Sequence, residues 1–422
     1  MLHFSRRLAF GIVSAGLFAG AVFAGDTSLP PPLADDKAHM PSGANHLQWN
    51  TEERLIGHRN MQTISPARLV KAGGTVYPLP KDPDITVSYQ IDGVPYSLDD
   101  YFKRARTSGL LVIKNGHIVL ERYGNGYTDQ MAGTSRSMAK SMTSVMVGLA
   151  VKDGYIKSLD DTVSQYVPEF KGTLYEKISL RVMLQMLSGI PYTENAADPA
   201  TDVHSLLGCV YKNQKGCLVA VLKDIASRPA ATAHPPGTTY TYSTGDAALM
   251  AIIVERASKM NLSEYMSKRI WQPFGMERDG YWNVDNVDGN TLGGSGFGAT
   301  LRDYGRIGLF VMGNGLLPNG EKAFRDGWME ESIKPSAVSV TNKRRSPGAA
   351  EGKDTLPYGY FWWRPSSAHP AMPGIEGTYY AEGSNGQFLM VNPAEKVVIV
   401  KWGPMSFGDD RPLFAAIVNK LH

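Results

Sequence analysis

Short, apolar, β-rich segments lie near both ends of this 422-residue chain, and helical patterns fill its middle. Asn115-Gly116 joins two such segments, which predicts a hairpin. Further strands are expected at 358–363, 387–392 and 397–402, before a closing helix over 412–421. Between the two ends, apolar residues recur every three or four positions, which predicts helices over 138–151, 182–187, 218–226, 249–260 and 301–312. We therefore expect an α/β (α+β) fold, with a central antiparallel sheet built from the N- and C-terminal segments, flanking helices and a mostly helical inserted region at about 150–300.

The first 24 residues have the pattern of an export signal. Arg6 and Arg7 precede an apolar run over 8–23, and small residues occupy the cleavage positions at 22–24. We predict a signal peptide over 1–24 and a periplasmic or secreted protein, with no stable membrane insertion once the signal is removed. The alternative is a membrane anchor, which the run disfavours because a spanning helix needs roughly 20 apolar residues.

Composition divides the rest of the chain. Residues 25–48 are rich in Pro, Asp, Ser and Gly, so we expect a linker or an arm draped over the main body, with little order in either case. Residues 49–80 have no clear period and are expected to form an N-terminal extension packed on the main body. The main domain then spans 81–422.

Charge and cysteine content exclude some functions. The net charge is only +3 and no basic cluster is interleaved with aromatic residues, so nucleic acid is not expected as a partner. The nine histidines form no metal-binding pattern, so no metal or other cofactor is expected. Cys209 and Cys217 are the only cysteines, and in an oxidising compartment we expect them to form a disulfide. The alternative is two separate buried thiols.

The only Ser-x-x-Lys of the chain is Ser137-Met138-Ala139-Lys140, at the start of the apolar helix predicted over 138–151. Residues three apart share a helix face, so the lysine can reach the serine oxygen, and the helix start directs free N–H groups at an oxyanion. Burial disfavours the charged form of a lysine, which helps such a residue accept the hydroxyl proton. The spacing therefore indicates a nucleophilic serine with a lysine base.

A second motif runs from Pro236-Gly237 to Tyr242-Ser243-Thr244 and precedes another apolar helix. With Ser137-x-x-Lys140, it resembles the serine β-lactamase and penicillin-recognising superfamily, in particular the class C β-lactamase-like branch. Further stretches carry the resemblance from about residue 110 to 421: 154–168, 178–189, 271–276, 299–308 and 358–363. Met186-Leu187-Ser188-Gly189 and Gly383-Ser384-Asn385-Gly386-Gln387 are most similar to exported relatives of 6-aminohexanoate-dimer hydrolase, an amidase of nylon oligomers, and to related esterases.

The resemblance implies a role for each matching residue. It implies that Ser137 is the nucleophile, Lys140 its base and Tyr242 the group that passes a proton to the leaving group. It implies an oxyanion site made by the backbone N–H groups of Ser137 and Ser384, and substrate contacts from Tyr192, Thr244, Gly383 and Asn385. For Tyr242 the alternative is a buried structural tyrosine, for Ser384 a plain edge-strand residue, and for Tyr192 an ordinary loop tyrosine.

The chain departs from the family pattern at two places. It has no Lys-Thr-Gly near the C-terminus, and Thr244 stands where the family usually has Asn, so a carboxamide that would contact Lys140 is missing. The expected function is that of an exported serine hydrolase cleaving an amide or ester bond of a small molecule through an acyl-enzyme. The alternatives are a β-lactamase or D-amino-acid peptidase acting on peptidoglycan-type substrates, and a non-catalytic binding protein that retains the fold. The sequence leaves the oligomeric state undetermined.

Overall fold

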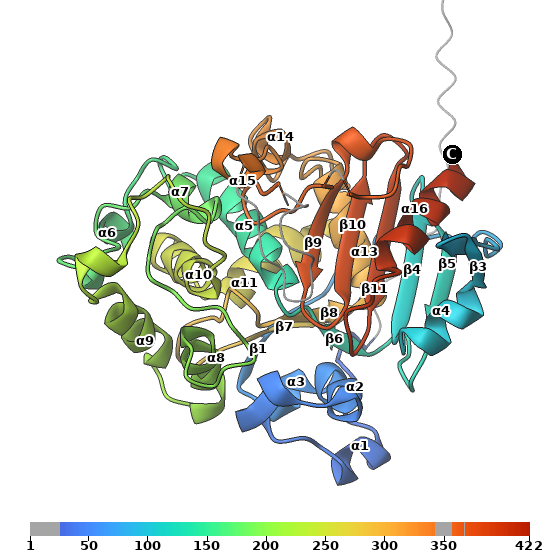
Figure 1. Ribbon diagram of the computed structural model, residues 1–422, viewed down its shortest axis with the longest axis horizontal. Coiled ribbons are helices and arrows are strands. Elements are labelled where there is room, and N and C mark those ends of the chain that lie inside the picture. The colour runs from blue at the N-terminus through green and yellow to red at the C-terminus, as the bar shows by residue number, and fades with distance from the viewer. Residues whose placement is uncertain (1–25, 342–356, 367) are drawn as a thin grey trace, which may run out of the picture.

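The structure, a computed structural model, describes residues 26–341, 357–366 and 368–422. Strands from near both ends of the chain form an antiparallel five-stranded sheet (Figure 1) in the order β5 (His117–Tyr123), β4 (Gly109–Lys114), β11 (Val397–Trp402), β10 (Gln387–Asn392) and β9 (Tyr379–Gly383). The β4–β5 hairpin turns at Asn115-Gly116, whose positive φ angles of 53° and 83° suit a two-residue turn. The predicted mixed fold, with a sheet of N- and C-terminal strands, is confirmed.

Helices cover both faces of this sheet. On one face, α13 (Leu301–Met312) lies close because Gly305 and Gly308 have no side chain. A Cβ at Gly308 would lie 2.4 Å from Val398, and one at Gly305 would lie 2.7 Å from Ile113. On the opposite face, α16 (Asp410–Leu421) packs Phe414 edge-on against Phe388, with ring centroids 5.5 Å apart.

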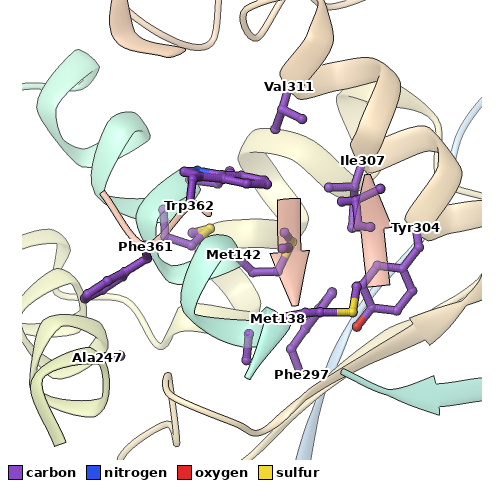
Figure 2. Packing of buried hydrophobic residues seen from close by; sticks show 14 of the residues in the cluster. Met138, Met142, Ala247, Phe297, Tyr304, Ile307, Val311, Phe361 and Trp362 are labelled. Atoms are coloured by element: carbon purple, nitrogen blue, oxygen red, sulfur yellow. The ribbon is translucent and has the colours of Figure 1, made fainter. Parts of the chain in front are cut away.

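The central helix is α5 (Met138–Lys152), in which 13 of 15 residues are buried, as its apolar pattern predicted. Figure 2 shows Met138 and Met142 of α5 in one apolar cluster with Tyr304 and Ile307 of α13. The first turn of α5 is therefore fixed in the core, and the residues at its start are held firmly.

Most regular elements of the inserted region are helices, and the region also contributes two short strands to a second sheet. A four-stranded sheet has the order β1 (Ala67–Val70), β7 (Gly280–Asn283), β8 (Phe297–Thr300) and β6 (Ala132–Thr134). The helical segments of this region are α6 (Val163–Tyr166), η2 (Pro168–Phe170), α7 (Leu180–Leu184), α8 (Asp202–Lys212), α9 (Cys217–Ala226), η3 (Ala230–Thr232), α10 (Thr244–Ser258), α11 (Leu262–Met266), η4 (Ser267–Trp271) and α12 (Gln272–Phe274).

The N-terminal segment is more ordered than its composition suggested. The expectation of little order over 25–48 is wrong for the described residues, which include α1 (Ala34–Ala38) and η1 (Gly43–Gln48). One contribution to this order is a buried carboxylate, because Asp36 accepts hydrogen bonds from Arg59 and Asn60 at 2.7 and 2.9 Å. The segment continues into α2 (Thr51–Arg59) and α3 (Met61–Ile64), and Figure 1 shows these helices together below the main body. The predicted signal peptide lies outside the described residues.

The remaining elements complete the periphery. They are β2 (Ser88–Ile91), β3 (Val94–Ser97), α4 (Leu98–Arg104), α14 (Trp328–Ser332), α15 (Ala337–Thr341) and η5 (Ile375–Gly377). Within the described ranges, no helix is both long enough and apolar enough to span a bilayer.

Candidate active site

A sharp turn connects β6 to α5 and places Ser137 at the helix start. Arg136 has a left-handed backbone, with φ of 49°, and Ser137 is the N-cap residue of α5. The Lys140 N–H donates to the Ser137 carbonyl at 3.1 Å, which closes the first turn. Ser137 is half-buried and Lys140 fully buried, so the hydroxyl is within reach of a ligand while the amine is shielded from water.

The Lys140 side chain meets three oxygen atoms. Its Nζ lies 3.0 Å from Ser137 Oγ, 2.9 Å from Thr244 Oγ1 and 2.9 Å from the carbonyl oxygen of Gly294. These partners come from the first turns of α5 and α10 and from the loop between β7 and β8. The structure thus brings the predicted nucleophile and the predicted base within hydrogen-bond distance.

Tyr242 and Thr244 reach the same place because they flank the start of α10. Ser243 caps this helix through its side chain, which accepts from the Asp246 N–H at 2.9 Å. The Tyr242 ring faces Lys140, with Nζ 4.6 Å from the ring centroid, and stacks on Trp363 with centroids 5.6 Å apart. Tyr242 therefore lies beside the Ser137–Lys140 pair, and its role as a proton donor stays a prediction.

Thr244 contacts Lys140 in the place of the usual Asn. The carboxamide is absent, as the sequence indicated, and the Thr244 hydroxyl makes the contact to Lys140 Nζ. A hydroxyl and a carboxamide oxygen both accept hydrogen bonds, so the smaller residue supplies the same acceptor.

The aromatic segment 358–363 also differs from expectation. It was predicted as a central strand, but it is a tight bend in which Tyr358 pairs with Trp363 and Phe361 has a φ of 60°. The bend presents Trp363 to Tyr242 and packs Tyr358 edge-on against the same ring, with centroids 6.2 Å apart. A run of aromatic residues indicates a buried segment, whether that segment is a strand or a bend. The sequence therefore could not distinguish a strand from a bend at 358–363.

The turn between β9 and β10 lies directly beside the start of α5. A Cβ on Gly383 would lie 2.2 Å from the Ser135 carbonyl oxygen and 3.1 Å from Arg136, so only glycine fits there. The next residue, Ser384, is exposed, and Asn385 has a left-handed backbone with φ of 63°. This close approach explains the glycine, while the roles of Gly383, Ser384 and Asn385 toward a ligand stay predictions.

Tyr192 is buried in the loop that follows α7. Its side chain is 6% exposed, and its ring lies 2.9 Å from where a Cβ of Gly245 would be. Burial raises the pKa of the Tyr192 hydroxyl, which has no hydrogen-bond partner among the described residues. A substrate contact by Tyr192 stays a prediction.

Sequence reasoning missed two participants. Glu194 accepts hydrogen bonds from the Thr244 N–H at 2.9 Å and from its hydroxyl at 2.5 Å, and no motif surrounds this residue. Gly294 supplies a carbonyl to Lys140. The pair Gly293-Gly294 was a usable signal, because adjacent glycines indicate close backbone approach.

Cys209 and Cys217 form a disulfide with a Cα–Cα distance of 5.5 Å, which joins α8 to the start of α9. In the part of the chain that the structure describes, no three His, Cys, Asp or Glu side chains gather as metal ligands.

Comparison with known proteins identifies the family to which this chain belongs. Residues 98–403 match the family model described as Beta-lactamase. A 6-aminohexanoate-dimer hydrolase of Paenarthrobacter ureafaciens is 26% identical over 327 residues, which are 76% of this chain and 78% of that protein.

Solved structures agree. A Bacillus anthracis protein provisionally described as a 6-aminohexanoate-dimer hydrolase superposes with a TM-score of 0.76 at 23% identity, over 93% of this chain and 98% of that one. EstCE1, described as a hydrolase with promiscuous acyltransferase activity, superposes with a TM-score of 0.57 at 16% identity, over 76% and 96% of the two chains. At these identities the two structures establish a shared fold.

Proposed function

Because the chain belongs to the beta-lactamase family, we propose that it is a serine hydrolase that cleaves an amide or ester bond through a covalent acyl-enzyme. The observation that carries the proposal is the 3.0 Å distance between Lys140 Nζ and Ser137 Oγ at the start of a buried helix. A buried amine beside a half-buried hydroxyl is the arrangement in which a serine becomes a nucleophile. The same geometry argues against the binding-protein alternative.

The proposed reaction assigns one step to each residue of the candidate site. Neutral Lys140 accepts the hydroxyl proton of Ser137 while Oγ attacks the carbonyl carbon. The backbone N–H groups of Ser137 and Ser384 stabilise the oxyanion. Tyr242 donates its phenol proton to the leaving amine or alcohol and regains one from the Lys140 ammonium, so both groups return to their starting states as the acyl-enzyme forms. Water then attacks the ester carbonyl and gives a proton to Lys140. As the acid product leaves, this proton passes to Ser137 Oγ and restores the hydroxyl.

The substrate class is part of the proposal. The relative named for hydrolysis of the 6-aminohexanoate dimer supports a linear amide as substrate, and the acyltransferase activity in the description of EstCE1 supports chemistry through an acyl-enzyme. On β9, which lies next to the Ser137 turn, the last three residues are Ala381-Glu382-Gly383, so this strand offers no cation to a β-lactam carboxylate. A β-lactamase is therefore the less favoured alternative.

We also infer that the protein is exported. The basic and apolar pattern over 1–24 supports a signal peptide, and the bond between Cys209 and Cys217 is of a kind that persists in oxidising compartments. Secretion of a fusion of residues 1–24 to a reporter enzyme tests this step, and a reporter retained in the cytoplasm would contradict it.

A fluorophosphonate probe tests the enzyme assignment. The wild-type protein should be labelled on the peptide that contains Ser137, and Ser137→Ala should be neither labelled nor active on p-nitrophenyl acetate. Ser144→Ala is the matched control, because it removes another hydroxyl from the same helix. The Ser144 hydroxyl is buried and has no hydrogen-bond partner among the described residues. Labelling at another serine, or activity in Ser137→Ala, would overturn the proposal.

A further inference from the structure

Glu194 lies in the loop before α8 and is hydrogen-bonded to Thr244, the first residue of α10. Its Oε2 accepts from the Thr244 N–H at 2.9 Å, and its Oε1 accepts from the Thr244 hydroxyl at 2.5 Å. The short oxygen–oxygen distance is typical of a hydroxyl that donates to a carboxylate. An ionised carboxylate only accepts, so the direction of this hydrogen bond is fixed.

The direction of that bond determines what Thr244 can offer to Lys140. A hydroxyl has one proton, and in Thr244 this proton lies toward Glu194. Toward Lys140, whose Nζ is 2.9 Å away, the Thr244 oxygen can therefore only accept. The third neighbour of Nζ, the Gly294 carbonyl at 2.9 Å, has no proton and also only accepts.

The two acceptors together orient the amine. A neutral amine has two N–H groups and one lone pair, and the N–H groups of Lys140 point at Thr244 and Gly294. The lone pair of the amine therefore points at the remaining neighbour, Ser137 Oγ, at 3.0 Å. Without an acceptor that holds its proton, Thr244 could donate to Nζ and occupy the lone pair that Ser137 needs.

We propose that Glu194 is a positioning residue: by holding the Thr244 proton, it directs the lone pair of Lys140 at the Ser137 hydroxyl. This inference rests on the proposed function. When Ser137 attacks, its proton moves from Oγ to Nζ, and the ammonium so formed donates to the same three oxygens. Glu194 neither gains nor loses a proton in this step. An Asn carboxamide oxygen cannot donate, so a threonine at this position needs the additional residue.

Glu194→Gln is the sharpest test, because the two side chains have the same shape. Both Thr244 groups donate to Glu194, and a carboxamide can accept only one of them with its oxygen while its NH₂ meets the other. We expect the rate of fluorophosphonate labelling at Ser137, and kcat for p-nitrophenyl acetate, to fall roughly 10- to 100-fold, with KM within about two-fold of the wild type. Asp198→Asn, on the same loop and exposed, should leave both rates unchanged.

A double-variant cycle with Thr244→Val shows whether Glu194 acts through Thr244. Valine keeps the shape and removes the hydroxyl, so Glu194→Gln should cost less than about three-fold in that background. Equal losses in both backgrounds, or a Glu194→Gln protein within two-fold of the wild-type labelling rate, would overturn the inference alone. A wild-type protein that is not labelled at Ser137 would overturn the proposed function and this inference with it. Circular dichroism of each variant identifies loss of fold, and Glu194→Gln is interpretable by itself if Thr244→Val does not fold.

Discussion

The Arg136 guanidinium contacts Nε2 of His58 at 3.0 Å, so the residue directly before Ser137 is held by α2 of the N-terminal segment. An arginine side chain only donates, so Nε2 accepts and the imidazole is neutral. Both side chains are buried, with 4% of Arg136 and 2% of His58 exposed. The N-terminal helices are therefore part of the support of the candidate active site.

The first prediction concerns stability in acid. Burial, and then the charges of Arg136 and Arg54, hold the pKa of His58 well below its usual range. The unfolded chain takes up this proton below about pH 6.5, whereas the folded protein does so only at much lower pH. The stability from neutral His58 is thus complete above about pH 6.5 and is lost progressively as pH falls below that value.

His58→Gln keeps an acceptor for Arg136 and does not titrate, so it should remove this loss. Urea unfolding of both proteins at several pH values between neutral and about pH 5 measures the difference in free energy of unfolding. Parallel stability curves for the wild type and the variant would contradict the assignment of a neutral buried imidazole.

The second prediction concerns proton transfer. Lys140→Met keeps a buried stem without the amine, and Tyr242→Phe keeps the ring on Trp363 without the hydroxyl. Each should lower kcat roughly 10²- to 10⁴-fold with little change in KM. The double variant should lose less than the product of the single losses if the two groups work as one unit. Near wild-type kcat in either single variant would make that residue structural, and Tyr155→Phe, at an exposed tyrosine, serves as the control.

The fold and part of the candidate site could be predicted because local patterns determine them. The hairpin at Asn115-Gly116 and the helix over 301–312 follow from turn chemistry and apolar period, and the structure has both. Ser137 and Lys140 lie one helical turn apart, so their proximity was readable from spacing.

Contacts between distant segments could not be predicted in the same way. Glu194 is 50 residues from Thr244, and Lys140 is 154 residues from Gly294. Their meeting depends on how α5, α10 and the loop after β7 pack, which no local period encodes. The order of the N-terminal segment was missed because it comes from contacts to distant residues, among them those of Asp36 with Asn60 and of Thr27 with Asp279.

The third prediction concerns substrate preference. β9 ends in Ala381-Glu382-Gly383 beside the Ser137 turn, so the end of this strand offers no cation to a β-lactam carboxylate. Short-chain p-nitrophenyl esters and linear amides of amino-alkanoic acids should therefore have higher kcat/KM than a chromogenic cephalosporin. Competition between the substrates in one assay measures the ratio directly. A cephalosporin turned over faster than both would place the protein among β-lactam hydrolases.

The fourth prediction concerns the disulfide between Cys209 and Cys217, which closes a segment with a sequence separation of 8. Closing so short a loop should stabilise the fold by at most about 2 to 3 kcal/mol, so Cys209→Ala/Cys217→Ala should lower Tm by several degrees. The effect should extend to the candidate site, because α8 begins at Asp202, whose carboxylate accepts from the N–H of Thr193, the neighbour of Glu194, at 2.9 Å. Since Glu194 is proposed to set the rate and not the affinity, we expect kcat to fall more than KM rises. Thermal unfolding and steady-state kinetics measure the two effects separately, and thiols that titrate in the folded, periplasm-purified wild type would contradict the bond itself.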